Sequence, residues 1–314
     1  MRLSESNAQN DIPSEQARPE LVALIRARDR TYRAAKLTQG TFVIFSILLP
    51  IAGVFLGANY PSLKPFLALS GLILLLVDTA YLDPLQKDRI KRGAKLQEEF
   101  DTTVLHLPWN RFVSGAKVDP EDVRAASGKL LSQARESQIA CWYEPCVGDV
   151  PIQLARLICQ RTNISYDARL RRTYGTWLLY GTAALGVILS FVGLAFDLSF
   201  SGLLLMVVVP LMPLLNWALR ECQKQKDTAN HLVVLKGEFE KLWEMALKGT
   251  RSRDLDRRSR ELQDAIYQHR ASSPLVFDWV YYRLRNRNED EAQHAAQTLV
   301  RQAKESLKLE VDRT

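Results

Sequence analysis

Four long stretches of this sequence carry almost no charge, and they constrain the fold more than any other feature. Residues 37–63, 173–196 and 198–219 contain no Asp, Glu, Lys or Arg, and residues 66–82 contain only Asp78. An α-helix needs roughly 20 mainly apolar residues to cross the hydrocarbon core of a bilayer. Inside a bilayer the backbone must satisfy its own hydrogen bonds, so such stretches cross it as helices. We therefore predict four transmembrane helices, at about residues 41–60, 66–82, 174–196 and 198–219.

The overall composition hides these stretches. Charged residues make up 25% of the chain and the mean hydropathy is −0.13, values that are typical of a soluble protein. The apolar residues are nevertheless concentrated in four blocks, which form two close pairs. One such block fits a buried helix of a soluble protein, but four in this arrangement favour two membrane-spanning hairpins.

Basic residues flank the predicted spans on one side only. They lie before span one (Arg26, Arg28, Arg30, Arg33, Lys36), after span two (Lys87, Arg89, Lys91, Arg92, Lys95), before span three (Arg169, Arg171, Arg172) and after span four (Arg220, Lys224, Lys226). The connections on the other side, at residues 60–65 and at Asp197, hold only Lys64. Because basic residues near spans stay in the cytoplasm, we expect both termini to be cytoplasmic, in a multi-pass membrane protein.

These charges also divide the chain. We expect a cytoplasmic N-terminal segment (1–36), a first transmembrane hairpin (37–83), a cytoplasmic helical segment (84–172), a second hairpin (173–219) and a cytoplasmic helical C-terminal segment (220–314). The first 36 residues are polar and do not resemble a signal peptide, so span one is expected to be its own uncleaved insertion signal. The net charge of +7 is explained by the membrane and needs no nucleic-acid polymer as a partner.

The polar segments show helical patterns. Asp119 and Pro120 form a typical helix start, and apolar residues follow it three and four positions apart. The same spacing recurs after span four, from Leu232 to Ala246, and again from Leu255 and from Ala292. No segment alternates with a period of two. The sequence therefore predicts an all-α fold, in which the middle segment and the C-terminal tail form a cytoplasmic helical domain.

Motifs of common enzymes are absent from the sequence. It contains no GxxxxGK[ST], GxGxxG, GxSxG or HExxH motif, so we predict that the protein is not an enzyme and has no cofactor. The four cysteines lack the close CxxC pairing of structural zinc sites, so we predict reduced thiols and no metal. These cysteines are Cys141, Cys146, Cys159 and Cys222.

Two polar residues lie within the predicted spans. Asp78 and Asn216 are candidates for lining a pore, since an ionisable group inside a membrane is by default functional. Asp78 is also close to the predicted cytoplasmic boundary, where an acid is tolerated, and both readings stay open. Arg171 and Arg172 directly precede span three, so we expect them at the lipid headgroups.

Aromatic and basic residues in the middle segment suggest a ligand site. Stacking faces and forked donors suit a base and a phosphate, and the candidates that offer them or lie among them are Trp109, Asn110, Trp142, Tyr143, Arg156, Arg161, Asn163 and Arg169. Packing of the tryptophans in the core is the simpler alternative. Arg156, Arg161 and Arg169 are the residues we predict to bind an anion, on a helix that runs into span three.

Several of these blocks together resemble one family. They are LQEEFDTTVLHLPWN (96–110), Trp142-Tyr143, LICQRTNISYDARLRRTY (157–174) and LQDAIYQHRASSPLVFDWVYYRLRNRNEDE (262–291). The pattern is similar to that of the SMODS-associating four-transmembrane effectors of bacterial anti-phage systems, from about Asp11 to Ala303.

The resemblance implies a function. Members of that family accompany cGAS-like nucleotidyltransferases in cyclic-oligonucleotide signalling (CBASS), so the protein would bind a cyclic oligonucleotide in its cytoplasmic part. It would then disrupt or permeabilise the inner membrane, as a homo-oligomer, and cause abortive infection. The sequence leaves two alternatives: a small constitutive ion channel or transporter, and a scaffold anchored by its spans.

Overall fold

The computed structural model describes residues 10–128, 131–164, 168–249, 252–277 and 293–308. All regular structure within these ranges is helical, which confirms the predicted all-α class. The helices are α1 (Ile12–Glu15), α2 (Pro19–Asn59), α3 (Lys64–Val77), α4 (Asp83–Val104), α5 (Arg111–Ser114), α6 (Pro120–Ser127), α7 (Gln133–Ala140), α8 (Ile152–Ile164), α9 (Ala168–Ala195), α10 (Phe200–Leu203), α11 (Val209–Leu247) and α12 (Ser252–Ser272), followed by a helix over residues 293–308.

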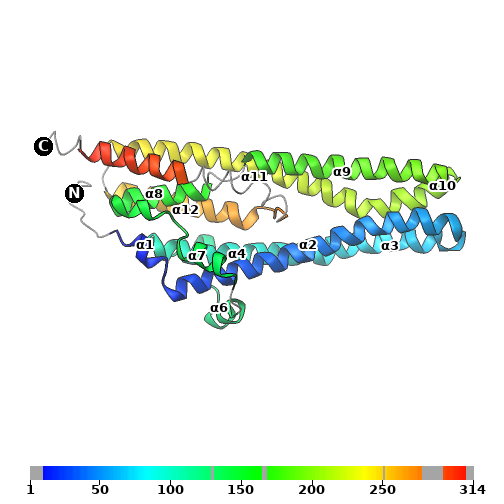
Figure 1. Ribbon diagram of the computed structural model, residues 1–314, viewed down its shortest axis with the longest axis horizontal. Coiled ribbons are helices and arrows are strands. Elements are labelled where there is room, and N and C mark those ends of the chain that lie inside the picture. The colour runs from blue at the N-terminus through cyan, green and yellow to red at the C-terminus, as the bar shows by residue number, and fades with distance from the viewer. Residues whose placement is uncertain (1–9, 129–130, 165–167, 250–251, 278–292, 309–314) are drawn as a thin grey trace.

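Four helical segments of the described chain are long and apolar enough to cross a membrane, as predicted. They are α2, the continuous helix of α3 and α4, α9, and the continuous helix of α10 and α11. At 41 residues, α2 is about twice as long as a bilayer requires. Three of these helices therefore extend beyond the membrane into a polar helical body, and the molecule is elongated, with the spans at one end and the body at the other (Figure 1).

Two of the long helices contain a π-helical turn, and a proline explains each one. The turns comprise Asp78–Leu82 and Leu204–Val208. Pro84 and Pro210 follow them and have no N–H to donate to the carbonyl four residues earlier. The helix accommodates the missing bond by widening locally instead of breaking, so each span stays mechanically continuous with the helix that follows it.

Glycines allow the two hairpins to approach each other inside the membrane. A Cβ on Gly53 of α2 would overlap the carbonyl oxygen of Met206. This carbonyl lies four residues before Pro210, which has no N–H to donate to it. A Cβ on Gly71 of α3 would lie 2.9 Å from the Cα of Pro210. The widened turn of the fourth span is therefore one place at which the backbones of the two hairpins approach closely.

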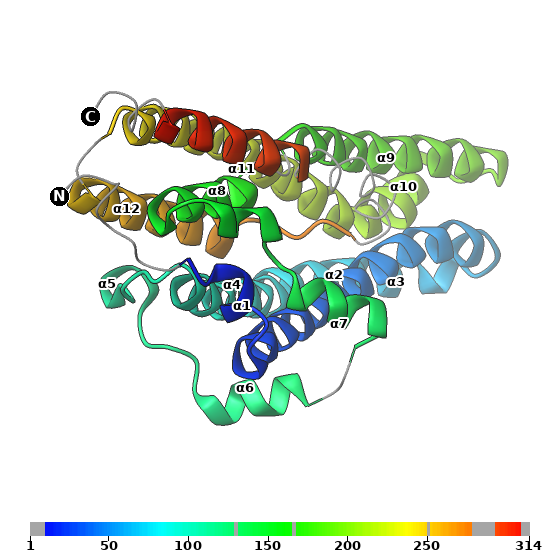
Figure 2. The same cartoon turned by 60° about the vertical axis from the view of Figure 1, so that its left-hand side comes forward.

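The polar body has a hydrophobic core built from all three polar parts of the chain. Buried residues come from α2, α4, α8, α11, α12 and the helix over 293–308, for example Ile25, Phe100, Leu157, Phe239 and Ile266. In this core α12 lies between α4 and α8 (Figure 2). The N-terminal half of α2 thus joins the two segments that were predicted to form the helical domain.

Candidate functional site

The two hairpins meet through charged side chains where the spans pass into the polar body. Asp78, in the π-helical turn of the first hairpin, is 4% exposed and accepts a hydrogen bond from Arg220 of α11. Its charge is therefore paired across the two hairpins. This contact gives the acid predicted within span two a specific partner, whereas its role in lining a pore stays a prediction.

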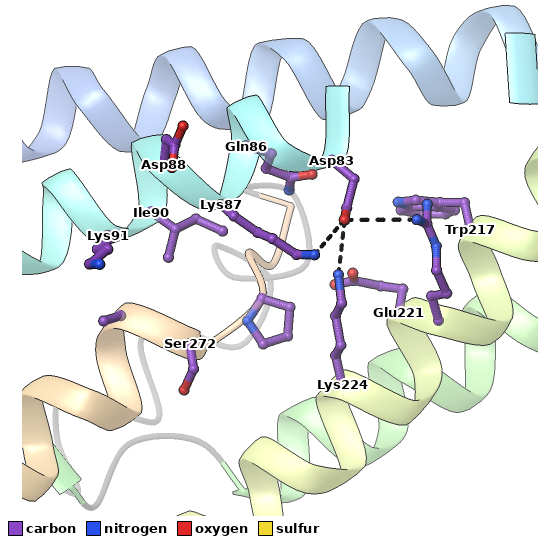
Figure 3. Close-up of a pocket in the computed structure, with 13 residues that line it drawn as sticks. Asp83, Gln86, Lys87, Asp88, Ile90, Lys91, Trp217, Glu221, Lys224 and Ser272 are labelled. Carbon is purple, nitrogen blue, oxygen red and sulfur yellow. Dashed lines mark hydrogen bonds and ion pairs between the residues drawn. The ribbon is translucent and has the colours of Figure 1, made fainter. Parts of the chain in front are cut away.

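Asp83, at the start of α4, is the centre of this charged cluster. Its carboxylate lies 2.6 Å from Nζ of Lys87, 3.0 Å from Nζ of Lys224 and 3.9 Å from Nη1 of Arg220, as Figure 3 shows. We call Asp78, Asp83, Lys87, Arg220 and Lys224 the junction residues. Three cations thus converge on one carboxylate, and two of them belong to the opposite hairpin.

A pocket of about 330 Å³ opens beside these residues. It lies between α4, α11 and the end of α12, and we call it the junction pocket (Figure 3). Lys91 adds a fourth cation to its lining, while Trp217 and Pro274 supply apolar surface. Of the other acids that line it, Asp88 is exposed and points away from the centre, whereas Glu221 is buried and accepts a hydrogen bond from Gln225.

An extended segment, residues 273–277, runs from the end of α12 between the two hairpins. We call it the connector. Arg171 of α9 donates to the carbonyl of Pro274 at 3.0 Å, and Gln225 of α11 donates to that of Leu275 at 3.3 Å. Side chains of the connector pack on both hairpins: Leu275 on Ala35 and Ile90, and Phe277 on Tyr174 and Trp217. The end of α12 is therefore attached to both hairpins at this boundary.

Buried ion pairs attach α12 to α4 inside the body. Arg260 lies 2.7 Å from Glu98, and Arg270 lies 2.5 Å from Asp101. Both carboxylates are fully buried. Burial raises the pKa of Glu98 to about 7, although Arg260 and Gln263 both donate hydrogen bonds to it. Charges of this kind specify how α12 sits against α4, because a shifted register would leave them unpaired.

Arg156 was predicted to bind a ligand, and in the structure its guanidinium bonds other groups of the protein. Arg156 is 6% exposed. Its Nε donates to the carbonyl of Leu105 at 2.8 Å, and its Nη1 lies 2.6 Å from Asp256 of α12. It therefore anchors α8 to the end of α4 and to α12.

Two other predicted ligand residues meet in the core of the body. The hydroxyl of Tyr143 donates to Asp101 at 2.7 Å and accepts from Asn163 at 3.0 Å. Tyr143 is 1% exposed, so both residues belong to the buried network around Arg270. The structure brings these two residues together but leaves little of Tyr143 for a ligand.

The predicted aromatic residues do not share one surface. Trp109 donates to the carbonyl of Gly115, and Asn110 caps α5 and donates to Asp264, so this pair sits beside α12. Trp142 precedes Tyr143 in the sequence, and its ring stacks under two guanidinium groups. These belong to Arg28 and Arg135, at 5.0 and 5.8 Å from the ring centroid.

The basic residues before span three have separate surroundings. Arg161 stacks on Phe239, 5.6 Å from the ring centroid, and burial lowers its pKa. Arg171 bonds Gln225 and the connector, and Arg172 donates to Asn230 of α11, so both hold α9 to α11 at the expected membrane interface. The side chain of Arg169, and the joint between α8 and α9 at residues 165–167, lie outside the described residues. Asn216 is part-buried one turn before Arg220.

Reasoning from the sequence missed the junction as a site. It used Lys87, Arg220 and Lys224 only to orient the spans, and it treated Asp83 as a boundary. One signal in the sequence could have indicated it: the acids at the end of span two and the bases after span four are expected at the same membrane depth. What the sequence does not state is that these two helix ends are neighbours.

Comparison with known proteins decides the family. The model of the SMODS-associating 4TM effector domain matches residues 10–299, which is most of the chain. The chain belongs to this effector family. It is also 26% identical over 281 residues to a probable CBASS effector molecule of Bacillus cereus (strain VD146), covering 87% of this chain and 92% of that protein. No solved structure matches this effector.

Proposed function

We propose that this protein is the membrane effector of a bacterial anti-phage system of the CBASS type. It lies in the inner membrane with its polar body and both termini in the cytoplasm, and the body responds to a cyclic oligonucleotide made by a cGAS-like nucleotidyltransferase. The response permeabilises the membrane and stops the infected cell. Membership of the effector family and the likeness to the Bacillus cereus relative support this proposal.

One structural observation carries the mechanism. The α3–α4 and α10–α11 helices continue from the membrane into the body, so a displacement of α4 or α11 in the body moves a span directly. A ligand shifts such an equilibrium only by binding one arrangement more tightly, and a near-complete switch takes about 5.5 kcal/mol. Several charge-assisted bonds to phosphate groups, at about 1.5–3 kcal/mol each, are sufficient.

Permeabilisation requires a rearrangement of the spans. In the described arrangement the two hairpins are packed together by apolar side chains, including Val54, Leu189 and Val207. This packing buries apolar side chains between the two hairpins of one copy. We therefore expect the active form to contain several copies whose spans have separated and reassociated, and a constitutive channel is the less favoured function.

Expression in bacteria together with a cyclic-oligonucleotide synthase tests the proposal. We expect the membrane-potential dye signal to collapse with the active synthase and to persist with a catalytically inactive one. Collapse without a synthase would indicate a constitutive channel. Growth arrest with an intact membrane potential would indicate a scaffold that recruits a partner, and either result would contradict the proposal.

A further inference from the structure

The centre of the junction pocket is a cluster of three cations around one carboxylate, that of Asp83. Lys87, Lys224 and Arg220 all lie within 3.9 Å of the single carboxylate of Asp83. Arg220 is shared with Asp78, so the two lysines depend on Asp83 alone among the ion pairs described at the junction. A carboxylate placed among several cations is a competitor that another anion can displace.

The geometry of the pocket suits one class of anion. A phosphate group presents its charge on oxygens that point in different directions, and an ammonium group binds it as a point charge. Beside the lysines, Trp217 and Pro274 form an apolar wall for the part of the ligand that is not phosphate. The opening of about 330 Å³ accommodates a phosphate and its substituents, whereas a larger ligand would extend outside.

We propose that the junction pocket is a phosphodiester site, in which a phosphate replaces the Asp83 carboxylate on Lys87 and Lys224. Two sources offer this chemistry at this depth: a cyclic oligonucleotide from the polar side, and the headgroup of an anionic phospholipid from the bilayer. The nucleotide source rests on the proposed function, whereas the lipid source does not. In both cases the exchange removes the contact of Asp83 with Lys224, which joins the two hairpins.

Binding to variants of the full-length protein tests the site. In nanodiscs of neutral phosphatidylcholine, we expect purine cyclic di- or trinucleotides to bind the wild type. Lys87→Gln and Lys224→Gln should each weaken binding about tenfold or more, because each removes a charged partner of the phosphate. Lys226→Gln is the matched control: it makes the same change on α11, at an exposed residue that does not line the pocket, and should leave binding unchanged.

Asp83→Asn separates a binding site from a structural ion-pair cluster. If Asp83 competes with the ligand, its neutralisation should tighten phosphodiester binding severalfold. If the cluster only holds the helices together, Asp83→Asn should weaken binding in the same direction as Lys224→Gln, together with a lower melting temperature. That second result would overturn the proposal.

A parallel series in nanodiscs that contain phosphatidylglycerol identifies the source. Retention of this lipid through native mass spectrometry, lost in Lys224→Gln and kept in Lys226→Gln, would assign the pocket to a headgroup. The same pattern for the nucleotide alone would assign it to the soluble ligand. If neither ligand depends on the two lysines, the site is wrong. Should nucleotides still trigger membrane leakage in Lys224→Gln, only the location of the site fails and the proposed function stands.

Discussion

At the scale of single residues, the buried guanidinium of Arg156 has specific partners, which illustrate the cost of removing it. Its guanidinium bonds the carbonyl of Leu105, at the end of α4, and the carboxylate of Asp256. We predict that Arg156→Ala lowers the free energy of unfolding by about 2 kcal/mol or more, because it leaves a buried carbonyl and a void.

Thermal denaturation in detergent measures this change. Arg257→Ala is the control. Arg257 follows Asp256, the partner of Arg156, on α12, but its side chain is 68% exposed, so its loss should cost less than about 0.5 kcal/mol. Nucleotide binding, measured on the same samples, should survive Arg156→Ala in the fraction that remains folded. Equal melting temperatures for the two variants would contradict the structural role.

His269, near the end of α12, makes stability depend on pH. Burial, followed by the charges of Arg171 and Arg270, lowers its pKa to about 3, whereas an unfolded chain titrates near about 6.5. Below about pH 6.5 the unfolded chain therefore binds a proton that the folded chain does not. The contribution of His269 is complete above this pH and is lost as the pH falls toward about 3.

We predict that acidification from about pH 7 to about pH 5 lowers the melting temperature of the wild type more than that of His269→Gln. The slope difference should approach at most about 1.4 kcal/mol per pH unit. Glu98 acts in the opposite direction, since its raised pKa favours protonation of the folded chain, but it is present in both proteins and cancels. If acidification lowered the melting temperatures of the wild type and of His269→Gln by the same amount, His269 would not be the cause of the pH dependence.

At the scale of elements, the contact between the hairpins depends on the lack of a side chain at Gly53. A Cβ there would overlap the carbonyl of Met206, and backbone cannot move aside as a flexible side chain can. We predict that Gly53→Ala destabilises the folded protein by about 1–3 kcal/mol and separates the hairpins locally.

Gly181→Ala provides the matched control for this substitution. Gly181 lies in the middle of α9, also within a span, and an added Cβ would meet no atom within 4 Å. Alanine should be neutral or slightly stabilising there, because it forms helix better than glycine by about 1 kcal/mol. The melting temperatures of the two variants, measured in the same detergent, test the close approach of Gly53 to Met206. Equal melting temperatures for Gly53→Ala and Gly181→Ala would refute it.

The elements differ in how far sequence alone predicts them. The four spans follow from charge and length, since each satisfies its backbone within one segment and needs no knowledge of its neighbours. The connector cannot be predicted in this way. It is a short extended segment, and contacts with other helices hold it in place, among them those with Arg171, Gln225 and Trp217. The buried partners of Arg156 and Tyr143 could not be predicted for the same reason: residue type and spacing do not state whether a polar side chain faces a ligand or the core. Their ligand-binding role stays a prediction.

At the scale of the whole molecule, the distribution of basic residues predicts which side each part faces. We expect Ser62, in the turn of the first hairpin, to lie on the outer side of the membrane, and Ser137, on α7, to lie in the cytoplasm. Both residues are exposed. Introduced singly as cysteines in a background without the native ones, Ser62→Cys should react with an impermeant maleimide in spheroplasts. Ser137→Cys should react only after permeabilisation, and the reverse pattern would invert the topology.

The central claim joins the two ends of the molecule: a cyclic oligonucleotide acts on the polar body, and the spans open the membrane. Its most direct test is dye release from liposomes that contain the purified protein, with nucleotide added to the side that the polar body faces. The account predicts release that rises with nucleotide concentration and is absent without it. Equal release with and without nucleotide, or none at saturating binding, would contradict the account.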